Sequence, residues 1–228
     1  MTVSPAPRAR RAVVFDLDGT LVDSAPDIHD AINAVLVEES RAQVSLSRVI
    51  GMIGDGAEQL VARAFAESGP RPEGAALRAL LSRFLARYEA HPARLTKPFP
   101  GVADTLALLK REGYRLGVCT NKPDRLTTVV LAALDLAPYF DAVVGPDAVE
   151  RRKPDAAHMR ATLEALGASA EDATMVGDGL NDVRIAKAAG MPCVCVTFGY
   201  AHQPPSTLGA DVLIDRFEEL PGALARLA

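Results

Sequence analysis

Short apolar runs alternate with helix-like segments through most of the sequence, and this alternation constrains the fold more than any other feature. Six runs predict strands, at residues 13–15, 114–119, 142–144, 174–176, 193–197 and 212–214. Most of the segments between them carry apolar residues at helical spacing. Strands that alternate with helices form a parallel sheet whose two faces are covered by helices. The sequence therefore predicts an α/β core.

The block between the first and second of these strands has a different pattern. From residue 21 to residue 92 the apolar positions recur at helical spacing, and no run there predicts a strand. Ser24, followed by Pro26 and Asp27, is typical of a helix start in which the serine side chain caps the first turn. Because the block interrupts the alternation of strands and helices, we interpret it as an insertion into the core.

These patterns divide the chain into three parts. Residues 1–10 form a basic segment with two prolines and predict a disordered tail. Residues 11–21 and 95–228 predict the α/β catalytic core, and residues 22–94 predict a helical cap. The expected architecture is a Rossmann-like parallel sheet core with an inserted all-helical cap domain.

Composition excludes several classes of function. The chain has 25 lysines and arginines against 29 acidic residues, which gives a formal charge of −4 and argues against partners that are nucleic acids or anionic membranes. The chain has no run close to the roughly 18 apolar residues of a membrane span, and no apolar signal segment follows the basic tail. Cys119, Cys193 and Cys195 lie in apolar runs, which indicates reduced, buried thiols in a cytoplasmic protein.

Polar residues capable of chemistry follow the predicted strands. The residues concerned are Asp16 and Asp18, Thr120 and Asn121, Lys153, and Asp178 and Asp182. In open α/β sheets, ligands bind beyond the carboxyl ends of the strands. We therefore expect these side chains to converge on one edge of the sheet, although they are far apart in the sequence.

Each of these motifs has a simpler interpretation when it is taken alone. Asp16 and Asp18 could form a turn, and Lys153 could be a solvated lysine at a helix start. A calcium loop that begins at Asp16 would need glycine at its sixth position and glutamate at its twelfth, but Leu21 and Asp27 stand there. The glycine pattern at 51–56 follows no strand, so it is not a dinucleotide-binding fingerprint.

Taken together, the residues favour phosphoryl transfer. The negative charge of a phosphate monoester repels an attacking carboxylate, so it must first be neutralised. Magnesium prefers carboxylate and phosphate oxygens together with water, and Asp16 and Asp178 are suitable ligands. Lys153 adds a positive charge, and Thr120 offers a hydroxyl donor. Catalysis of this kind depends mainly on positioning and electrostatics.

Four segments resemble the signatures of the haloacid dehalogenase superfamily. Residues 15–21 (Phe-Asp-Leu-Asp-Gly-Thr-Leu) resemble the first signature. Residues 119–121, 153–154 and 176–182 resemble the other three, in the same order, so that the resemblance covers nearly the whole chain from residue 11. The dehalogenases of the superfamily lack the second aspartate of the first signature. The presence of Asp18 therefore argues against carbon–halogen chemistry.

The resemblance implies a role for each residue. Asp16 would attack phosphorus and form an aspartyl-phosphate, and Asp18 would protonate the leaving group and then activate water. Mg²⁺ would be held by Asp16, Asp178 and the backbone carbonyl of Asp18. Asp182 would orient the other groups or bind the metal through water. The phosphoryl oxygens would be held by Thr120, Asn121 and Lys153.

Further segments resemble bacterial phosphoglycolate phosphatases, namely residues 21–27, 53–57, 120–123 and 198–200. This resemblance implies hydrolysis of 2-phosphoglycolate to glycolate and phosphate beneath a helical cap. The cap loop would bring Gly54, Asp55 and Gly56 to the substrate. Lys122 directly follows Thr120 and Asn121, which makes it a candidate to bind the substrate carboxylate, and a solvated lysine is the alternative. Asp55 stands where asparagine is common, and its extra negative charge would disfavour a substrate with a carboxylate.

Other functions stay open on the sequence alone. The substrate, a small phosphorylated metabolite in any case, could be a sugar or amino-sugar phosphate, and a phosphomutase could share the fold. A phosphate-sensing protein without catalysis is the alternative outside enzymes, although such a protein would not need both Asp16 and Asp18. The chain is expected to act as a monomer or a homodimer.

Overall fold

A six-stranded parallel sheet forms the centre of the molecule, as shown by a computed structural model that describes residues 11–227. The expected disordered tail, residues 1–10, lies outside the described residues. The strand order is β5-β4-β1-β6-β7-β8. These strands are β1 (Ala12–Phe15), β4 (Arg115–Cys119), β5 (Ala142–Val144), β6 (Ala173–Gly177), β7 (Cys193–Val196) and β8 (Val212–Ile214). The predicted parallel sheet is confirmed.

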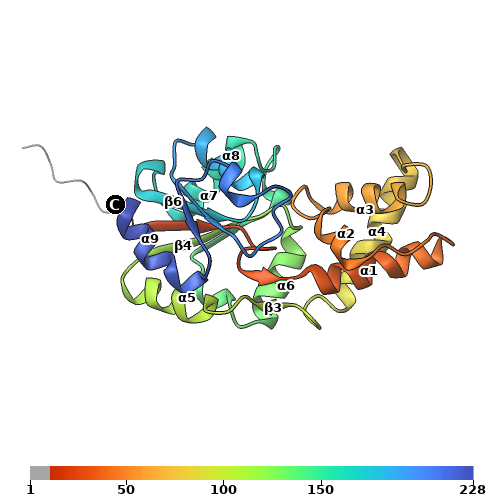
Figure 1. The fold of residues 1–228 in the computed structure, drawn as a ribbon, viewed down its shortest axis with the longest axis horizontal. Coiled ribbons are helices and arrows are strands. Elements are labelled where there is room, and N and C mark those ends of the chain that lie inside the picture. The colour runs from red at the N-terminus through yellow and green to blue at the C-terminus, as the bar shows by residue number, and fades with distance from the viewer. Residues whose placement is uncertain (1–10, 228) are drawn as a thin grey trace, which may run out of the picture.

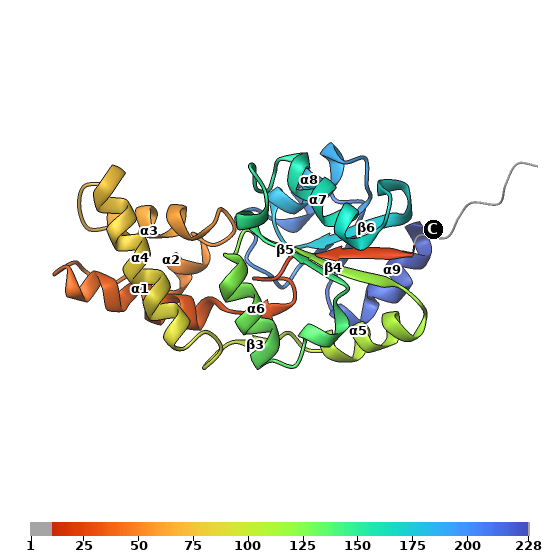
Figure 2. The ribbon, with the colours of Figure 1, turned by 180° about the vertical axis from the view of Figure 1, so that it is seen from behind.

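Helices cover both faces of this sheet (Figures 1 and 2). On one face lie α5 (Val102–Arg111), α6 (Asp124–Ala133) and α9 (Leu220–Leu227), and on the other lie α7 (Ala156–Leu166) and α8 (Leu180–Ala188). Strand β1 shows why both faces must be covered. Val13 and Phe15 join the core cluster of the first face, whereas Ala12 and Val14 join that of the second. Successive side chains of a strand point to opposite faces, so an apolar strand needs a layer on each side.

Four helices form a separate layer beside the carboxyl ends of the strands, and we call residues 25–90 the helical insertion (Figure 1). They are α1 (Ala25–Glu38), α2 (Leu46–Ile50), α3 (Ala57–Ala66) and α4 (Gly74–Ala90). The insertion has its own apolar core, to which Ile32, Phe65 and Phe84 belong. Helix α2 was not predicted. It has five residues and a single buried one, Val49, so it shows no helical periodicity.

The chain enters and leaves the helical insertion through two short antiparallel strands. Strand β2 (Val22–Asp23) pairs with β3 (Lys97–Pro98), and we call this pair the linker ribbon. The sequence predicted no strand between residues 21 and 92, and β2 contradicts that prediction. Two residues are too few for an alternating pattern, so β2 could be found only from its partner.

Ser24 does not cap helix α1 in the predicted way. Its backbone has helical rather than extended angles, and its side chain accepts no bond from the first turn. Instead, its hydroxyl donates to Oδ1 of Asp18 at 2.6 Å. The hydroxyl thus acts as a donor to a carboxylate oxygen instead of accepting from an amide of the first turn. The amide of Ala25 donates instead to the hydroxyl of Tyr200 at 3.0 Å.

The three cysteines are buried and unpaired, as the sequence predicted. Among the described residues, no helix has both the length and the apolar character that crossing a membrane requires.

Candidate active site

Asp16 lies at the carboxyl end of β1, in the middle of the sheet. Its Oδ1 accepts a hydrogen bond from the amide of Leu17 at 2.7 Å and pairs with Nζ of Lys153 at 2.8 Å. Burial raises the pKa of Asp16 to about 6, against the opposing effect of the Lys153 ammonium. Both contacts fall on the same oxygen, so within residues 11–227 the second oxygen stays available for chemistry.

Asp178 follows β6, next to β1 in the sheet, and both of its carboxylate oxygens accept hydrogen bonds. The hydroxyl of Thr20 donates to Oδ1 at 3.2 Å, and the amide of Tyr200 donates to Oδ2 at 2.6 Å. Burial raises the pKa of Asp178 well above its usual value, and the nearby carboxylates of Asp182 and Asp16 raise it further. The ionised form of Asp178 therefore needs a positive charge nearby.

Asp182 lies in the first turn of α8 and joins that turn to Lys153. Its Oδ2 accepts from the amides of Asp178 and Gly179 at 3.2 and 3.0 Å, and its Oδ1 accepts from Nζ of Lys153 at 2.8 Å. All its observed contacts are thus with donors of the protein. These contacts join Lys153 to the first turn of α8 and to the amide of Asp178, which fits an orienting role, and the alternative role as a metal ligand through water stays a prediction.

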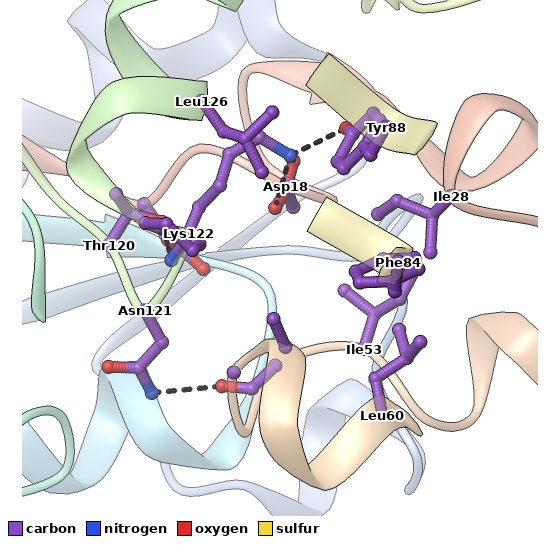
Figure 3. A pocket seen from close by; sticks show the side chains of 15 residues that line it. Asp18, Ile28, Ile53, Leu60, Phe84, Tyr88, Thr120, Asn121, Lys122 and Leu126 are labelled. Atoms are coloured by element: carbon purple, nitrogen blue, oxygen red, sulfur yellow. Dashed lines mark hydrogen bonds and ion pairs between the residues drawn. The ribbon is translucent and has the colours of Figure 1, made fainter. Parts of the chain in front are cut away.

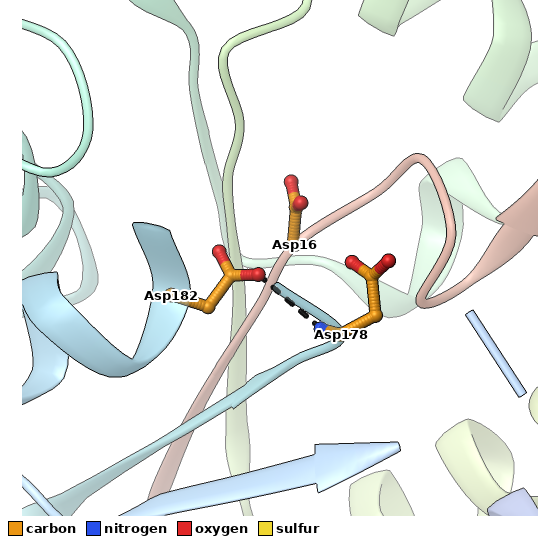
Figure 4. A group of neighbouring side chains, drawn as sticks. All are labelled: Asp16, Asp178 and Asp182. Carbon is orange, nitrogen blue, oxygen red and sulfur yellow. Dashed lines mark hydrogen bonds between the residues drawn. The ribbon is translucent and has the colours of Figure 1, made fainter. Parts of the chain in front are cut away.

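The three carboxylates converge on one small space (Figure 4). One ligand atom from each of Asp16, Asp178 and Asp182 lies within 4.8 Å of the others, and all three residues are buried. Lys153 is the only cation that pairs with them in the described part of the chain. Three buried carboxylates against one ammonium leave negative charge uncompensated, and burying unpaired charge is costly. The donor set, which consists of oxygens alone, fits a hard divalent cation such as Mg²⁺.

Lys153 is held in place by His158, which the sequence did not reveal as part of the site. The amide of Lys153 donates to Nδ1 of His158 at 3.2 Å, and Nε2 of His158 lies 3.1 Å from the carbonyl of Val144. Burial lowers the pKa of His158 to about 4, so the ring is neutral. The two contacts then assign the ring proton to Nε2, which donates to Val144.

Asp18 is joined to the helical insertion through Lys122 and Tyr88 (Figure 3). Its two oxygens lie 3.1 and 3.2 Å from Nζ of Lys122. Nζ of Lys122 also donates to the hydroxyl of Tyr88 at 2.6 Å and lies 4.4 Å from the centre of that ring. Burial alone would lower the pKa of Lys122, but Asp18 and Tyr88 raise it above its usual value. The ammonium of Lys122 therefore keeps its charge at the boundary between core and insertion.

Thr120 and Asn121 follow β4, as predicted, but their side chains have different surroundings. The hydroxyl of Thr120 accepts from the amide of Lys122 at 3.1 Å and still has its own proton to donate. The side-chain amide of Asn121 donates to the carbonyls of Gly54 and Lys153, at 3.0 and 3.1 Å. The Asn121 side chain therefore holds other parts of the site in place, and both protons of its side-chain amide are used in these contacts.

The loop of residues 53–56 carries the three predicted cap residues and rests on the core. Besides Asn121, the side chain of Asn181 donates to the carbonyl of Gly54 at 3.3 Å and to Oδ1 of Asp55 at 2.8 Å. Oδ2 of Asp55 pairs with Arg63 at 2.5 Å. Burial alone would raise the pKa of Asp55, but the bonds from Asn181 and Arg63 outweigh it and lower the pKa. The negative charge of Asp55, which the sequence predicted to disfavour a substrate with a carboxylate, is thus paired with Arg63.

Two cavities are both lined by Asp16, Asp18, Ile53 and Gly54. The cavity toward the insertion has a volume of about 50 Å³. The insertion lines it with Ile28, Leu60, Phe84 and Tyr88, and the core with Thr120, Lys122 and Leu126 (Figure 3). The second cavity, of about 230 Å³, contains the carboxylate cluster and Lys153. The site therefore has a small, mostly apolar side and a polar, charged side.

Comparisons with known proteins identify the family of this chain. Residues 13–196 match the model of a family described as haloacid dehalogenase-like hydrolase. The chain is 43% identical to a phosphoglycolate phosphatase of Caulobacter vibrioides, over 94% of this chain and 91% of that protein. It is 44% identical to one of Cereibacter sphaeroides, over 94% of this chain and 98% of that protein.

Solved structures of a named phosphatase and of a phosphate-bound protein have folds similar to that of this chain. A predicted phosphoglycolate phosphatase of Haemophilus somnus superposes with a TM-score of 0.88 at 28% identity, covering 95% of this chain and 98% of that chain. CbbY of Rhodobacter sphaeroides in complex with phosphate superposes with a TM-score of 0.79 at 27% identity, covering 92% of this chain and 96% of that chain.

Proposed function

Because the chain belongs to the haloacid dehalogenase-like hydrolases, we propose that its carboxylate site hydrolyses a small phosphate monoester with the aid of Mg²⁺. The family and the named relatives make it a phosphoric monoester hydrolase. The substrate that we propose is 2-phosphoglycolate, and the intermediate is an aspartyl-phosphate. The observation that carries the proposal is the position of Asp16 and Asp18, each of which lines both cavities.

Asp16 is the proposed nucleophile. Lys153 and the amide of Leu17 both hold its Oδ1, which fixes the carboxylate and leaves Oδ2 to attack phosphorus. The attack forms the bond from Oδ2 to phosphorus and breaks the bond from phosphorus to the ester oxygen. Fixing the attacking group in advance lowers the barrier, because no entropy is then lost at the moment of reaction.

Asp18 is the proposed acid and base. It lines the smaller cavity, where the leaving group would lie, and is held there by Ser24 and Lys122. Protonated Asp18 gives its proton to the leaving oxygen. As a carboxylate, it then takes a proton from the water that attacks the aspartyl-phosphate, which releases phosphate and restores Asp16.

A divalent cation fits the charge of the cluster, and Asp16, Asp178 and the backbone carbonyl of Asp18 would hold it. When bound, it neutralises phosphate charge in the transition state. Lys153 and the hydroxyl of Thr120 would hold the phosphoryl oxygens, together with the backbone amide of Asn121. Asp182 keeps Lys153 in place through its 2.8 Å contact.

The smaller cavity supports a substrate of only a few atoms. Its volume of about 50 Å³ is close to that of a few water molecules. The insertion contributes mostly apolar side chains to it, and these offer no partners for the several hydroxyls of a sugar. Lys122 supplies a buried positive charge beside Asp18. A short leaving group with one carboxylate, such as glycolate, matches both features, and the helical insertion would serve as the cap.

Phosphate release from a panel of about 30–50 phosphorylated metabolites, ranked by kcat/KM, tests the proposal. We expect 2-phosphoglycolate to rank first and chelation of Mg²⁺ to abolish release. Asp16→Asn should remove turnover without loss of the fold. A higher rank for sugar or amino-sugar phosphates would reject the substrate, and no release from any compound at any Mg²⁺ concentration would favour a phosphate-sensing protein.

A further inference from the structure

Tyr200 joins the carboxylate cluster to the base of the helical insertion through its two ends. Its backbone amide donates to Oδ2 of Asp178 at 2.6 Å. Its hydroxyl donates to Oδ1 of Asp23 at 2.5 Å and accepts from the amide of Ala25 at 3.0 Å. Asp23 belongs to the linker ribbon, and Ala25 is the first residue of α1. One residue therefore spans the distance from the cluster to the insertion.

The surroundings of Tyr200 leave little room for independent movement. The side chain is 8% exposed and packs within the apolar core of the insertion, although Tyr200 itself belongs to the α/β core. Gly19 has a φ of +85°, and a Cβ there would lie 2.5 Å from Oδ2 of Asp178 and 2.9 Å from the Tyr200 ring. A Cβ on Gly199 would lie 2.3 Å from Cβ of Asp178. Packing this close transmits displacement, because atoms in a dense core cannot absorb it.

The hydroxyl of Tyr200 makes one hydrogen bond as a donor and one as an acceptor. Its oxygen lies 2.5 Å from Oδ1 of Asp23, a carboxylate oxygen that can only accept, and 3.0 Å from the amide of Ala25, so the phenol proton is directed to Asp23. With one donor and one acceptor contact, it satisfies the carboxylate of Asp23 and the first free amide of α1 together. Loss of this hydroxyl would leave both groups without their partner.

We propose that Tyr200 is a positioning residue that couples cation binding at Asp178 to the linker ribbon, and through it to closure of the helical insertion over the substrate. The inference rests on the proposed function, because it takes Asp178 to be a ligand of Mg²⁺. A carboxylate that is drawn toward a cation moves the amide of Tyr200, and the same residue holds Asp23. Coupling of this kind is reciprocal, so a closed insertion also strengthens cation binding.

Tyr200→Phe tests the coupling, because it removes only the hydroxyl and keeps the ring and the amide. Tyr139→Phe is the matched control, since Tyr139 packs against the core of the sheet. Hydrogen exchange of amides 22–28 and 95–98 is measured with and without MgCl₂, and titration calorimetry gives the affinity for Mg²⁺ in the absence of substrate. For the wild-type protein and the control, we expect Mg²⁺ to slow exchange in both segments.

In Tyr200→Phe we expect the slowing by Mg²⁺ to fall at least about fivefold and the Kd for Mg²⁺ to rise by about the same factor. Asp23→Asn, which weakens the acceptor of the same bond, should have a similar effect. Equal slowing in Tyr200→Phe and wild type would overturn the proposal, as would a wild-type protein whose linker ribbon does not respond to Mg²⁺.

The phosphatase assay separates this result from the proposed function. An active wild-type enzyme with unchanged coupling in Tyr200→Phe refutes the role of Tyr200 alone. A wild-type protein that releases no phosphate, yet shows the exchange response and its loss in Tyr200→Phe, refutes the proposed function and leaves the coupling in place.

Discussion

Nζ of Lys122 lies 3.1 Å from Oδ1 of Asp18 and 2.6 Å from the hydroxyl of Tyr88. The residue that the sequence predicted to bind the substrate carboxylate thus also holds the proposed general acid. It further connects the core, which carries Lys122 and Asp18, to helix α4 of the insertion, which carries Tyr88. In the proposed mechanism, selection of the substrate, proton transfer and closure of the insertion would therefore all depend on this ammonium.

Lys122→Met should lower kcat/KM for 2-phosphoglycolate about 100-fold, because a charged partner of the carboxylate is lost. A neutral ester such as p-nitrophenyl phosphate should lose only about tenfold, through the disturbed placement of Asp18. Steady-state kinetics with both substrates measure the difference, and Lys110→Met, at the exposed pair with Asp141, is the control. Equal losses for the two substrates would reject a role of Lys122 in carboxylate recognition.

Asp55→Asn should leave the ranking of substrates unchanged. The charge of Asp55 is already paired with Arg63 at 2.5 Å, so little field from it reaches the smaller cavity. Both partners are about one-third exposed, and the loss of such a pair costs at most about 1 kcal/mol of stability. Kinetics on the substrate panel and thermal unfolding check both statements. A large gain for 2-phosphoglycolate in Asp55→Asn would show that the negative charge does act on the substrate.

The convergence of Asp16, Lys153, Asp178 and Asp182 could be predicted from the sequence, although their roles stay proposals. Asp16 and Asp178 directly follow strands of apolar residues, Asp182 lies four residues later in the first turn of α8, and parallel strands present their carboxyl ends on the same edge. This prediction requires only the positions of the strands in the sequence. It brings together residues that are more than a hundred positions apart.

The contribution of Tyr88, His158 and Tyr200 could not be predicted in the same way. Buried aromatic residues and a buried histidine in a helix have the pattern of ordinary core residues, and only the position of their polar atoms distinguishes them. Those positions depend on contacts between distant segments, such as the bond from Tyr200 to Asp23. The bond from Asn181 to Asp55 was missed for the same reason, because Asn181 is far from Asp55 in the sequence.

The stability of the protein should contain a term from His158 that depends on pH. Its pKa is lowered from 6.5 to about 4 in the folded state, so the unfolded chain binds a proton that the folded chain does not. The free energy of unfolding therefore holds its full value with respect to His158 above pH 6.5. It decreases as the pH falls toward 4, by an amount on the order of 2–3 kcal/mol. Urea unfolding of wild type and His158→Gln across this range measures it. An unchanged pH profile in His158→Gln would contradict the neutral, bonded ring.

Asp16→Asn should stabilise the protein without metal while it destroys activity. The pKa of Asp16 is raised to about 6, so above that pH its folded, ionised form is less stable than in the unfolded chain. Asparagine keeps an oxygen for Lys153 and Leu17 and removes one of three crowded charges. We expect a gain on the order of 1–3 kcal/mol at pH 8 in EDTA, which disappears as the pH falls from 6 to 4.

The same variant should lose the stabilisation that Mg²⁺ gives to the wild type, which is about 2.7 kcal/mol at a hundred times the Kd. Unfolding curves in EDTA and in MgCl₂ measure both effects, with Asp104→Asn as an exposed control. A metal-free Asp16→Asn protein that is less stable than wild type would mean that Lys153 compensates the carboxylates by itself. The argument for a cation from uncompensated charge would then fail, because the cluster would already be balanced without it.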